Sequence, residues 1–189
     1  ESVEGRKRTL KRFDVEEDTT MLSKPYDVSM VLDYSGSMYS AAPVVALGSK
    51  LFLATAHDSD RVSLVKFDDK ICRLNELTTD KQMLIDSARL DSIEGFGGST
   101  ALYAAASEGI DALKGAKNKK IMVLFTDGRE NASFQYFGKH PYLPYQLVEK
   151  ARKEHVRIII VSFGKGTDDF MLQRMADLAD GNHYHILAD

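Results

Sequence analysis

The feature that most constrains this chain is an alternation, from Pro25 onward, of short apolar runs with amphipathic patterns of helical period. This alternation is typical of α/β domains. Most runs are continuous Val, Ile, Leu and Phe, as expected for strands that helices cover on both faces. We therefore predict a doubly wound, mostly parallel sheet of six strands with helices on both faces. The predicted strands are Tyr26 to Asp33, Arg61 to Phe67, Ile71 to Asn75, Lys120 to Thr126, Val156 to Phe163 and His183 to Leu187.

One pair of predicted strands must be antiparallel. Only three residues, Asp68 to Lys70, separate the second strand from the third, which is too few for a helical crossover. We expect this hairpin at an edge of the sheet. Between the other strands, apolar residues recur at helical spacing, and we expect these stripes to face the core. They are Val44, Leu47, Leu51 and Ala54; Leu102, Ala105, Ala106, Gly109, Ile110 and Leu113; and Met171, Met175, Leu178 and Ala179, with Gly181 as a helix stop.

Size and charge exclude several classes of protein. The chain has 189 residues, 43% of them hydrophobic, which suits one domain with a substantial core. A formal net charge of −3 argues against nucleic acid or an anionic membrane as a partner. The longest apolar stretches, Ile121 to Phe125 and Ile158 to Val161, are too short to cross a bilayer, so we predict no membrane contact by this domain. Cys72 is the only cysteine, so no intrachain disulfide forms.

The first 22 residues differ from the rest in composition. A basic cluster beginning at Arg6 is followed directly by an acidic run from Asp14 to Asp18, which would cancel most of its field. We interpret residues 1–22 as a linker or the remnant of a preceding domain, and residues 23–189 as the folded domain. Because the chain begins with Glu1, we expect a fragment of a longer protein, whose compartment stays open.

Three polar loops lie where strands end or a helix begins. Asp33, Ser35 and Ser37 leave the first strand as a DxSxS loop, Thr100 closes a Gly-rich stretch before a helix, and Asp127 follows the fourth strand. In a sheet ordered 3-2-1-4-5-6, the first and fourth strands are neighbours, and their carboxyl ends form the expected ligand crevice. The carboxylate and two hydroxyls of the DxSxS loop are hard oxygen ligands for a divalent cation. We therefore predict that the carboxylates of Asp33 and Asp127 meet at this crevice.

Each of these loops also fits a simpler role. Taken singly, they could be a Ser-rich turn, a helix N-cap and an Asp-Gly turn. The glycines at 95, 97 and 98 could cradle a phosphate, but the Walker ending and the GxGxxG spacing are both missing. A magnesium-dependent phosphohydrolase of the haloacid dehalogenase type would carry a second Asp where this chain has Ser35, so an enzyme is the less favoured hypothesis.

Together, DxSxS, Thr in a Gly-rich loop and Thr-Asp-Gly after a strand resemble the metal-ion-dependent adhesion site of the von Willebrand factor type A family, relatives of integrin I domains. The resemblance covers roughly Ser23 to the C-terminus. It implies that Ser35, Ser37 and Thr100 offer hydroxyl oxygens to the metal, while Asp33 and Asp127 bind directly or through water. It also implies magnesium, with manganese or calcium as alternatives, and a partner protein that presents Asp or Glu.

The resemblance leaves two further expectations. The same family includes subunits of chelatase and AAA-linked complexes, so an intracellular assembly module is the alternative to adhesion, with a secreted or cell-surface location slightly favoured. Type A domains also usually carry a final helix, whereas this chain ends directly after its last predicted strand. Either the parent protein continues, or another segment such as Leu10 to Val15 covers the vacant apolar groove.

Aromatic residues gather in and beyond the predicted metal loops. We expect them to form a ligand-binding rim, because large rigid side chains dominate interface energetics; the alternative is that they fold inward and close the crevice. His183 and His185 share a strand face and could bind a metal, but the surface of a terminal strand is the favoured reading. Asn131 opens a glycosylation sequon that we treat as coincidence. The rim residues are Tyr34, Tyr39, Phe96, Tyr136 and Phe137.

Overall fold

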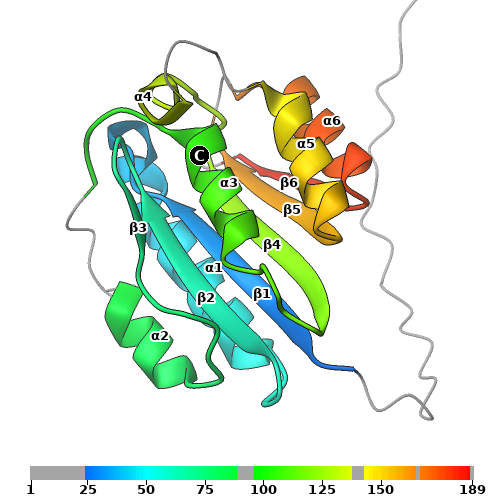
Figure 1. Cartoon of the computed structure of the whole chain (residues 1–189). Coiled ribbons are helices and arrows are strands. Elements are labelled where there is room, and N and C mark those ends of the chain that lie inside the picture. Colours follow the sequence, from blue (N-terminus) through cyan, green and yellow to red (C-terminus); the bar gives the residue numbers. More distant parts are fainter. Residues whose placement is uncertain (1–23, 89–95, 138–142, 165–166, 188–189) are drawn as a thin grey trace, which may run out of the picture.

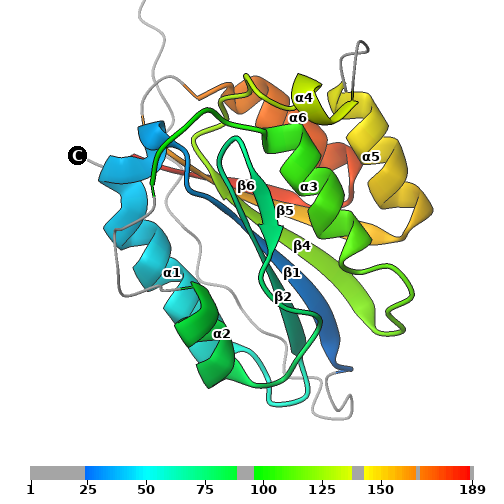
Figure 2. The ribbon, with the colours of Figure 1, turned by 60° about the vertical axis from the view of Figure 1, so that its left-hand side comes forward.

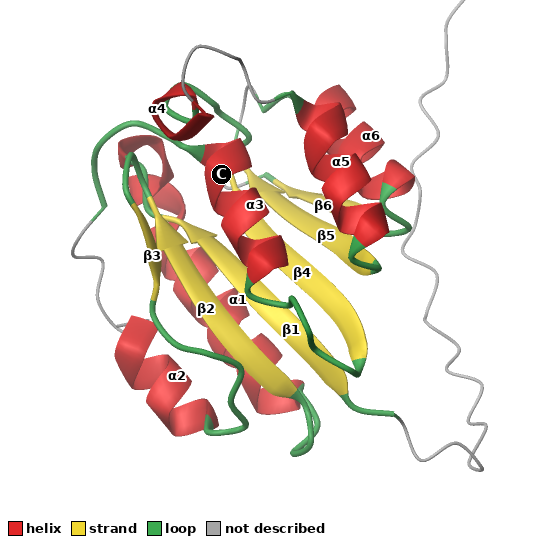
Figure 3. Cartoon of the chain, viewed as in Figure 1, coloured by secondary structure: helices red, strands yellow, loops and turns green. Residues whose placement is uncertain are grey.

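The computed structural model describes residues 24–88, 96–137, 143–164 and 167–187. They form a six-stranded sheet in the order β3-β2-β1-β4-β5-β6, which confirms the predicted order (Figure 1, Figure 3). Residues 1–22 and the segment Leu10 to Val15 lie outside the described residues. The strands are β1 (Tyr26–Asp33), β2 (Arg61–Phe67), β3 (Ile71–Arg73), β4 (Lys119–Thr126), β5 (Val156–Phe163) and β6 (Asn182–Ile186). The helices are the 3-10 helix η1 (Gly36–Ala41), α1 (Ala42–Thr55), α2 (Lys81–Ala88), α3 (Leu102–Asp111), α4 (Phe134–Phe137), α5 (Pro144–Lys153) and α6 (Asp169–Leu178).

Strand pairing follows the sequence prediction. β1 is parallel to both β2 and β4, so the strand that carries the DxSxS loop is central and its loop meets neighbours on both sides. β5 and β6 continue the parallel sheet. β2 and β3 form the predicted antiparallel hairpin at the edge. The carboxyl ends of five parallel strands therefore share one edge of the sheet.

Helices cover both faces of the sheet. α1 and α2 lie on one face, and α3, α5 and α6 lie on the other (Figure 2). One core cluster joins α1 and α2 to side chains such as Met30, Leu64 and Phe125. The second joins α3, α5 and α6 to the opposite faces of the same strands. Because both faces are buried, the central strands are rich in Val, Leu, Ile, Met and Phe, with a few buried polar residues such as Asp27 and Ser63.

The predicted inward face of α1 is wrong. Leu47 and Leu51 are 59% and 56% exposed, and Val44 and Ala54 are also exposed. The helix instead buries the side that carries Val45, Ser49 and Leu53. Because apolar residues occur nearly all round this helix, its sequence contains two apolar stripes, and only packing selects one of them.

One helical segment has the length and composition of a membrane span. Gly36–Thr55 is 20 residues long and apolar enough to cross a membrane by those two criteria alone. Within this segment, Val45 and Leu53 are buried in the core cluster beside β1, so one side of the segment is core.

Helices cover the two faces of the sheet unequally at its β6 edge. α6 packs on β5 and β6 from the α3 side, and no helix among the described residues covers β6 on the α1 side (Figure 2). Tyr184 pairs with Val161 and Ile186 pairs with Phe163 in the parallel register, so these side chains point to the α1 side, where both are exposed.

The end of α6 differs in detail from its prediction. Met175 and Ala179 are buried as expected, whereas Leu178 is exposed. The chain turns at Asp180, whose φ is 55°, rather than at Gly181. Asp tolerates this left-handed conformation because its short polar side chain can hydrogen-bond locally.

Candidate metal-binding site

The DxSxS loop is a tight turn that holds its own carboxylate. Asp33 ends β1 and is fully buried, and its Oδ1 accepts a hydrogen bond of 2.9 Å from the backbone N–H of Ser35. The hydroxyls of Ser35 and Ser37 lie 3.3 Å apart. Ser35 is buried and Ser37 is exposed. The loop therefore presents a carboxylate at its base and two hydroxyl oxygens together, one of them open to solvent.

The Gly-rich loop lies directly against this turn. The N–H of Gly36 donates to Gly98 O at 3.3 Å, and the N–H of Gly97 donates to Tyr34 O at 2.9 Å. Gly98 has a φ of 71°, which strains any other residue, and a side-chain Cβ there would lie 2.8 Å from Asp69 Oδ1. These contacts bring the loop that carries Thr100 beside the DxSxS loop.

Thr100 is buried just before α3. Its N–H donates to Asn131 Oδ1 at 2.7 Å, and its carbonyl accepts the N–H groups of Asn131 and Ala132 at 3.0 Å each. The N-cap of α3 is Ala101 and uses no side chain. The simple N-cap interpretation of Thr100 is therefore wrong, and its backbone is held by the loop that follows β4.

The third loop is joined to the first through Thr126. Its hydroxyl donates to Asp33 Oδ2 at 2.7 Å and accepts the N–H of Gly128 at 3.0 Å. Asp127 follows and is buried, with one oxygen accepting the N–H of Arg129 at 3.1 Å. Ser37 and Asp127 line the same hollow of about 310 Å³. The DxSxS loop and the Asp127 loop therefore open into one cavity.

Burial makes the ionised form of Asp33 costly. Desolvation raises the pKa of Asp33 to about 6, against the hydrogen bonds from Ser35 and Thr126 that lower it, and the negative charge of Asp127 raises it further. Arg129 offsets part of the charge of Asp127, since its Nε lies 3.4 Å from Asp127 Oδ2, but its side chain is largely exposed. Two carboxylates and three hydroxyls with too little positive charge fit a hard divalent cation.

Sequence reasoning missed two residues that brace the site. Besides Asn131, which holds Thr100, Glu130 accepts the N–H of Tyr103 at 3.0 Å and the hydroxyl of Ser133 at 2.6 Å. Glu130 thereby stabilises the first turn of α3 and ties it to the loop after β4. The only sequence signal was the sequon at Asn131, which pointed to glycosylation rather than to a structural amide.

The predicted aromatic rim divides into two groups. Tyr34 is buried and stacks on Phe96 with ring centroids 4.1 Å apart, while Lys66 Nζ lies 3.8 Å from the centroid of the Tyr34 ring. Phe137 packs against a small alanine cluster. Tyr39 and Tyr136 are exposed, and the hydroxyl of Tyr136 donates to Asp69 O at 2.9 Å. Only the second group presents a large surface to solvent.

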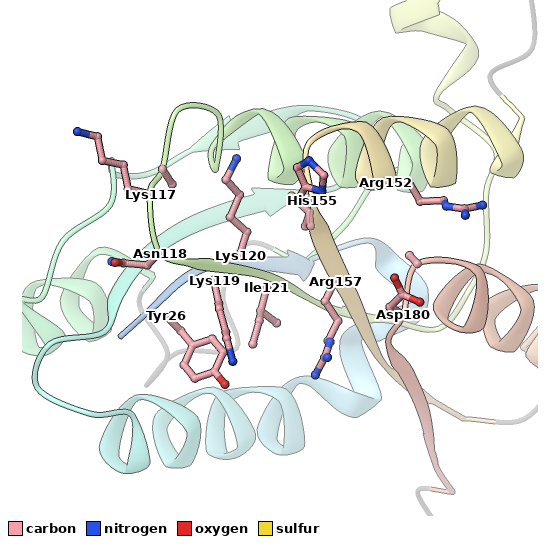
Figure 4. Close-up of a pocket in the computed structure, with 13 residues that line it drawn as sticks. Tyr26, Lys117, Asn118, Lys119, Lys120, Ile121, Arg152, His155, Arg157 and Asp180 are labelled. Atoms are coloured by element: carbon pink, nitrogen blue, oxygen red, sulfur yellow. The ribbon is translucent and has the colours of Figure 1, made fainter. Parts of the chain in front are cut away.

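A larger hollow, of about 810 Å³, lies at the opposite edge of the sheet, where the strands begin (Figure 4). It is rich in basic side chains, but they diverge: Lys119 and Lys120 leave the sheet on opposite sides (Figure 4). It contains none of the predicted ligands, so size alone does not locate the candidate site. Its basic residues are Lys117, Lys119, Lys120, Arg152, His155 and Arg157.

Comparison with protein families gives a match over most of the chain. The model of the von Willebrand factor type A domain matches residues 27–189. No curated protein matches the chain. The fold is similar to an aerotolerance-related membrane protein from Bacteroides fragilis, with a TM-score of 0.66 and 16% identity over 85% of this chain and 91% of that chain.

Two further similar structures are those of pilus proteins. The pilus adhesin SpaC from Lactobacillus rhamnosus GG, in its open conformation, has a TM-score of 0.67 and 19% identity over 89% of this chain and 28% of that chain. The vWF domain of a type V pilus tip protein from Porphyromonas gingivalis has a TM-score of 0.59 and 12% identity over 88% of this chain and 91% of that chain. At identities this low, the likeness shows a shared fold and no more.

Proposed function

Because this chain belongs to the von Willebrand factor type A domain family, we propose that it is a protein-interaction module that captures a partner through a bound divalent cation. The cation is magnesium, with manganese or calcium as substitutes. The partner supplies an Asp or Glu carboxylate as the outside ligand. The residues that hold the cation are Asp33, Ser35, Ser37, Thr100 and Asp127.

The observation that carries this proposal is the buried pair of carboxylates beside an open hollow. Asp33 is fully buried with a raised pKa, and Asp127 lines the cavity together with the exposed Ser37. Magnesium takes six oxygen ligands, and hydroxyls add oxygens without adding charge. Five protein groups leave one position for an outside oxygen, and a carboxylate is the ligand that best completes the charge balance.

The exposed aromatics supply the proposed contact surface. Tyr39 follows Ser37 in η1, and Tyr136 lies in α4, beyond the Asp127 loop. Both are exposed, and exposed tyrosines suit a binding surface because they add large contact area with few rotatable bonds. The other three aromatics pack within the domain: Tyr34 stacks on Phe96, and Phe137 packs against the alanine cluster.

An enzyme is less well supported. Both oxygens of Asp33 accept hydrogen bonds, one from the Ser35 N–H and one from the Thr126 hydroxyl. These bonds hold the carboxylate in its turn, and Ser35 stands where an enzyme of the haloacid dehalogenase type would carry its second Asp. The similarity to a membrane protein and to pilus adhesins favours a surface or secreted location, while an intracellular assembly role would use the same metal face.

Calorimetry tests the metal half of the proposal. Asp127→Ala removes one carboxylate from the cavity, so magnesium binding should be lost or weakened at least tenfold, whereas Asp86→Asn, an exposed carboxylate in α2, should leave it unchanged. Circular dichroism checks that both variants are folded. Equal magnesium affinity in Asp127→Ala and the wild type would remove the metal site.

A pull-down with and without chelator tests the partner half. Proteins that bind the wild type in magnesium should be released by chelator and should not bind Asp127→Ala. Tyr136→Ala should weaken their capture without lowering the melting temperature by more than a few degrees, since its ring is exposed. Partners that bind equally in chelator would show that the interaction surface lies elsewhere.

A further inference from the structure

A second group of side chains that can bind a metal lies at β6, where the row of strand ends that carries the candidate metal-binding site finishes. His183 and His185 alternate along β6 and point to the α6 side, and Asp169 is the first residue of α6. The sequence prediction placed both histidines on the surface of a terminal strand. That prediction is wrong for His183, whose side chain is 4% exposed.

The side chains converge closely. One ligand atom from each of Asp169, His183 and His185 lies within 4.8 Å of the other two. His185 Nδ1 is 2.9 Å and His183 Nε2 is 3.9 Å from Asp169 Oδ1. Ser162 Oγ lies 2.7 Å from His183 Nε2 and 3.0 Å from His185 Nδ1. Both rings therefore turn a nitrogen toward one point between β5, β6 and α6.

These separations are near those that a metal requires. In a tetrahedral zinc site, bonds of about 2.0–2.1 Å place the ligand atoms about 3.3 Å apart. The distances of 2.9 Å and 3.9 Å from Asp169 Oδ1 lie on either side of that value. Asp169 is 53% exposed at its side chain, which leaves one position open to water or an outside ligand.

We propose that His183, His185 and Asp169 form a second metal site, selective for zinc or a similar transition metal. Two imidazoles and one carboxylate suit zinc and its neighbours, whereas magnesium prefers oxygen ligands alone. Ser162 closes the buried side of this site. Its metal would clamp the start of α6 to β6.

The two sites are separate but share one row of the sheet. Leu32 of β1 pairs with Phe125 of β4, and the residues that follow them, Asp33 and Thr126, are joined by a side-chain hydrogen bond. Thr126 pairs with Ser162 of β5, and Ser162 pairs with His185 of β6. Three strand spacings of about 4.8 Å place the sites roughly 14 Å apart. Magnesium and zinc should therefore bind the same chain at once, each to the ligand set that suits it, and the zinc site does not depend on the proposed function.

Zinc titration of the full chain without a histidine tag tests the site. With magnesium saturating, calorimetry should show one zinc per chain, and His185→Ala should weaken binding about a hundredfold. Asp169→Asn should weaken it at least tenfold. Cobalt should give a tetrahedral absorption spectrum in the visible range that His185→Ala abolishes.

Controls separate this proposal from its alternatives. His57→Ala changes an exposed histidine outside the cluster and should leave zinc affinity unchanged. Asp127→Ala should also retain it, since that residue belongs to the other site. The proposal is overturned if zinc fails to bind saturably, if His185→Ala binds as tightly as the wild type, or if Asp127→Ala abolishes zinc binding. Should His185→Ala not fold, His185→Gln keeps the volume of the ring and decides the question.

Discussion

Among single residues, Asp33 has the most demanding environment. It is fully buried, both of its oxygens accept hydrogen bonds, and Asp127 lies close enough to repel its charge. A buried carboxylate favours its neutral form unless a cation compensates it. The metal-free domain should therefore be least stable where Asp33 is ionised.

When a chelator keeps the domain free of metal, its free energy of unfolding should depend on pH because Asp33 gains or loses a proton. Its pKa is about 6 in the folded chain and near 3.8 when unfolded, so between these values the folded state binds more protons. The free energy of unfolding should then fall as pH rises from 4 to 6, by an amount on the order of 3 kcal/mol, and level off above. Urea denaturation at several pH values measures it.

The variant Asp33→Asn separates the effect of Asp33 on the pH dependence of stability from that of the other carboxylates. Asp33→Asn cannot titrate, so the difference in stability between wild type and variant should change across the same pH range. Magnesium at pH 7 should restore stability to the wild type, because the cation offsets the charge of Asp33 and Asp127. Parallel curves for the two proteins would show that Asp33 is not the titrating group.

Among the elements, α1 and α3 each contain one glycine, but in different surroundings. A Cβ at Gly109 in α3 would collide with Val31 Cγ2 and lie 2.9 Å from Met122 Sδ, whereas a Cβ at Gly48 in α1 would meet only a ring atom of Phe125 at 3.7 Å. The first contact requires repacking of the core, and the second is ordinary van der Waals contact. Gly109 thus sets how closely α3 approaches β1 and β4.

Alanine at the two positions should have opposite effects. Gly109→Ala should cost about 1–3 kcal/mol through overpacking. Gly48→Ala should add about 0.5–1 kcal/mol, since alanine is the better helix former and has room. Chemical denaturation of both variants makes the comparison. If both are stabilised, α3 can move away from the sheet, and the close contact does not constrain it.

In the whole molecule, an apolar surface runs along the outside of α1. Val44, Leu47, Leu51 and Ala54 are exposed there, and Tyr184 and Ile186 are exposed on the same side of the sheet at β6. Exposed apolar side chains add little to folding when water contacts them. The contribution of α1 to the stability of the domain should therefore come from its opposite side, where Leu53 is fully buried.

Serine substitutions measure how much this surface contributes. The double variant Leu47→Ser with Leu51→Ser should lower the free energy of unfolding by less than about 1 kcal/mol, while Leu53→Ala should cost about 2–5 kcal/mol. A double variant as unstable as Leu53→Ala would mean that another part of the chain covers the outer surface of α1.

The sequence by itself determined the strands, their order and the loops of the candidate metal site. Apolar runs and the DxSxS, Thr100 and Asp127 spacings are local, and the rules of parallel sheets convert strand order into position. These predictions needed no knowledge of which side chains touch. The fold class and strand order were therefore confirmed, while the metal itself stays a prediction.

Only the tertiary structure decided which side of α1 is buried, that Asn131 and Glu130 brace the site, and that Asp169 meets His183 and His185. The last three residues come from a helix and a strand that are separated in the chain, so no local spacing relates them. The burial, the pKa and the contacts of a residue depend on side chains from distant parts of the sequence that pack against it. A periodic pattern along one segment does not contain that information.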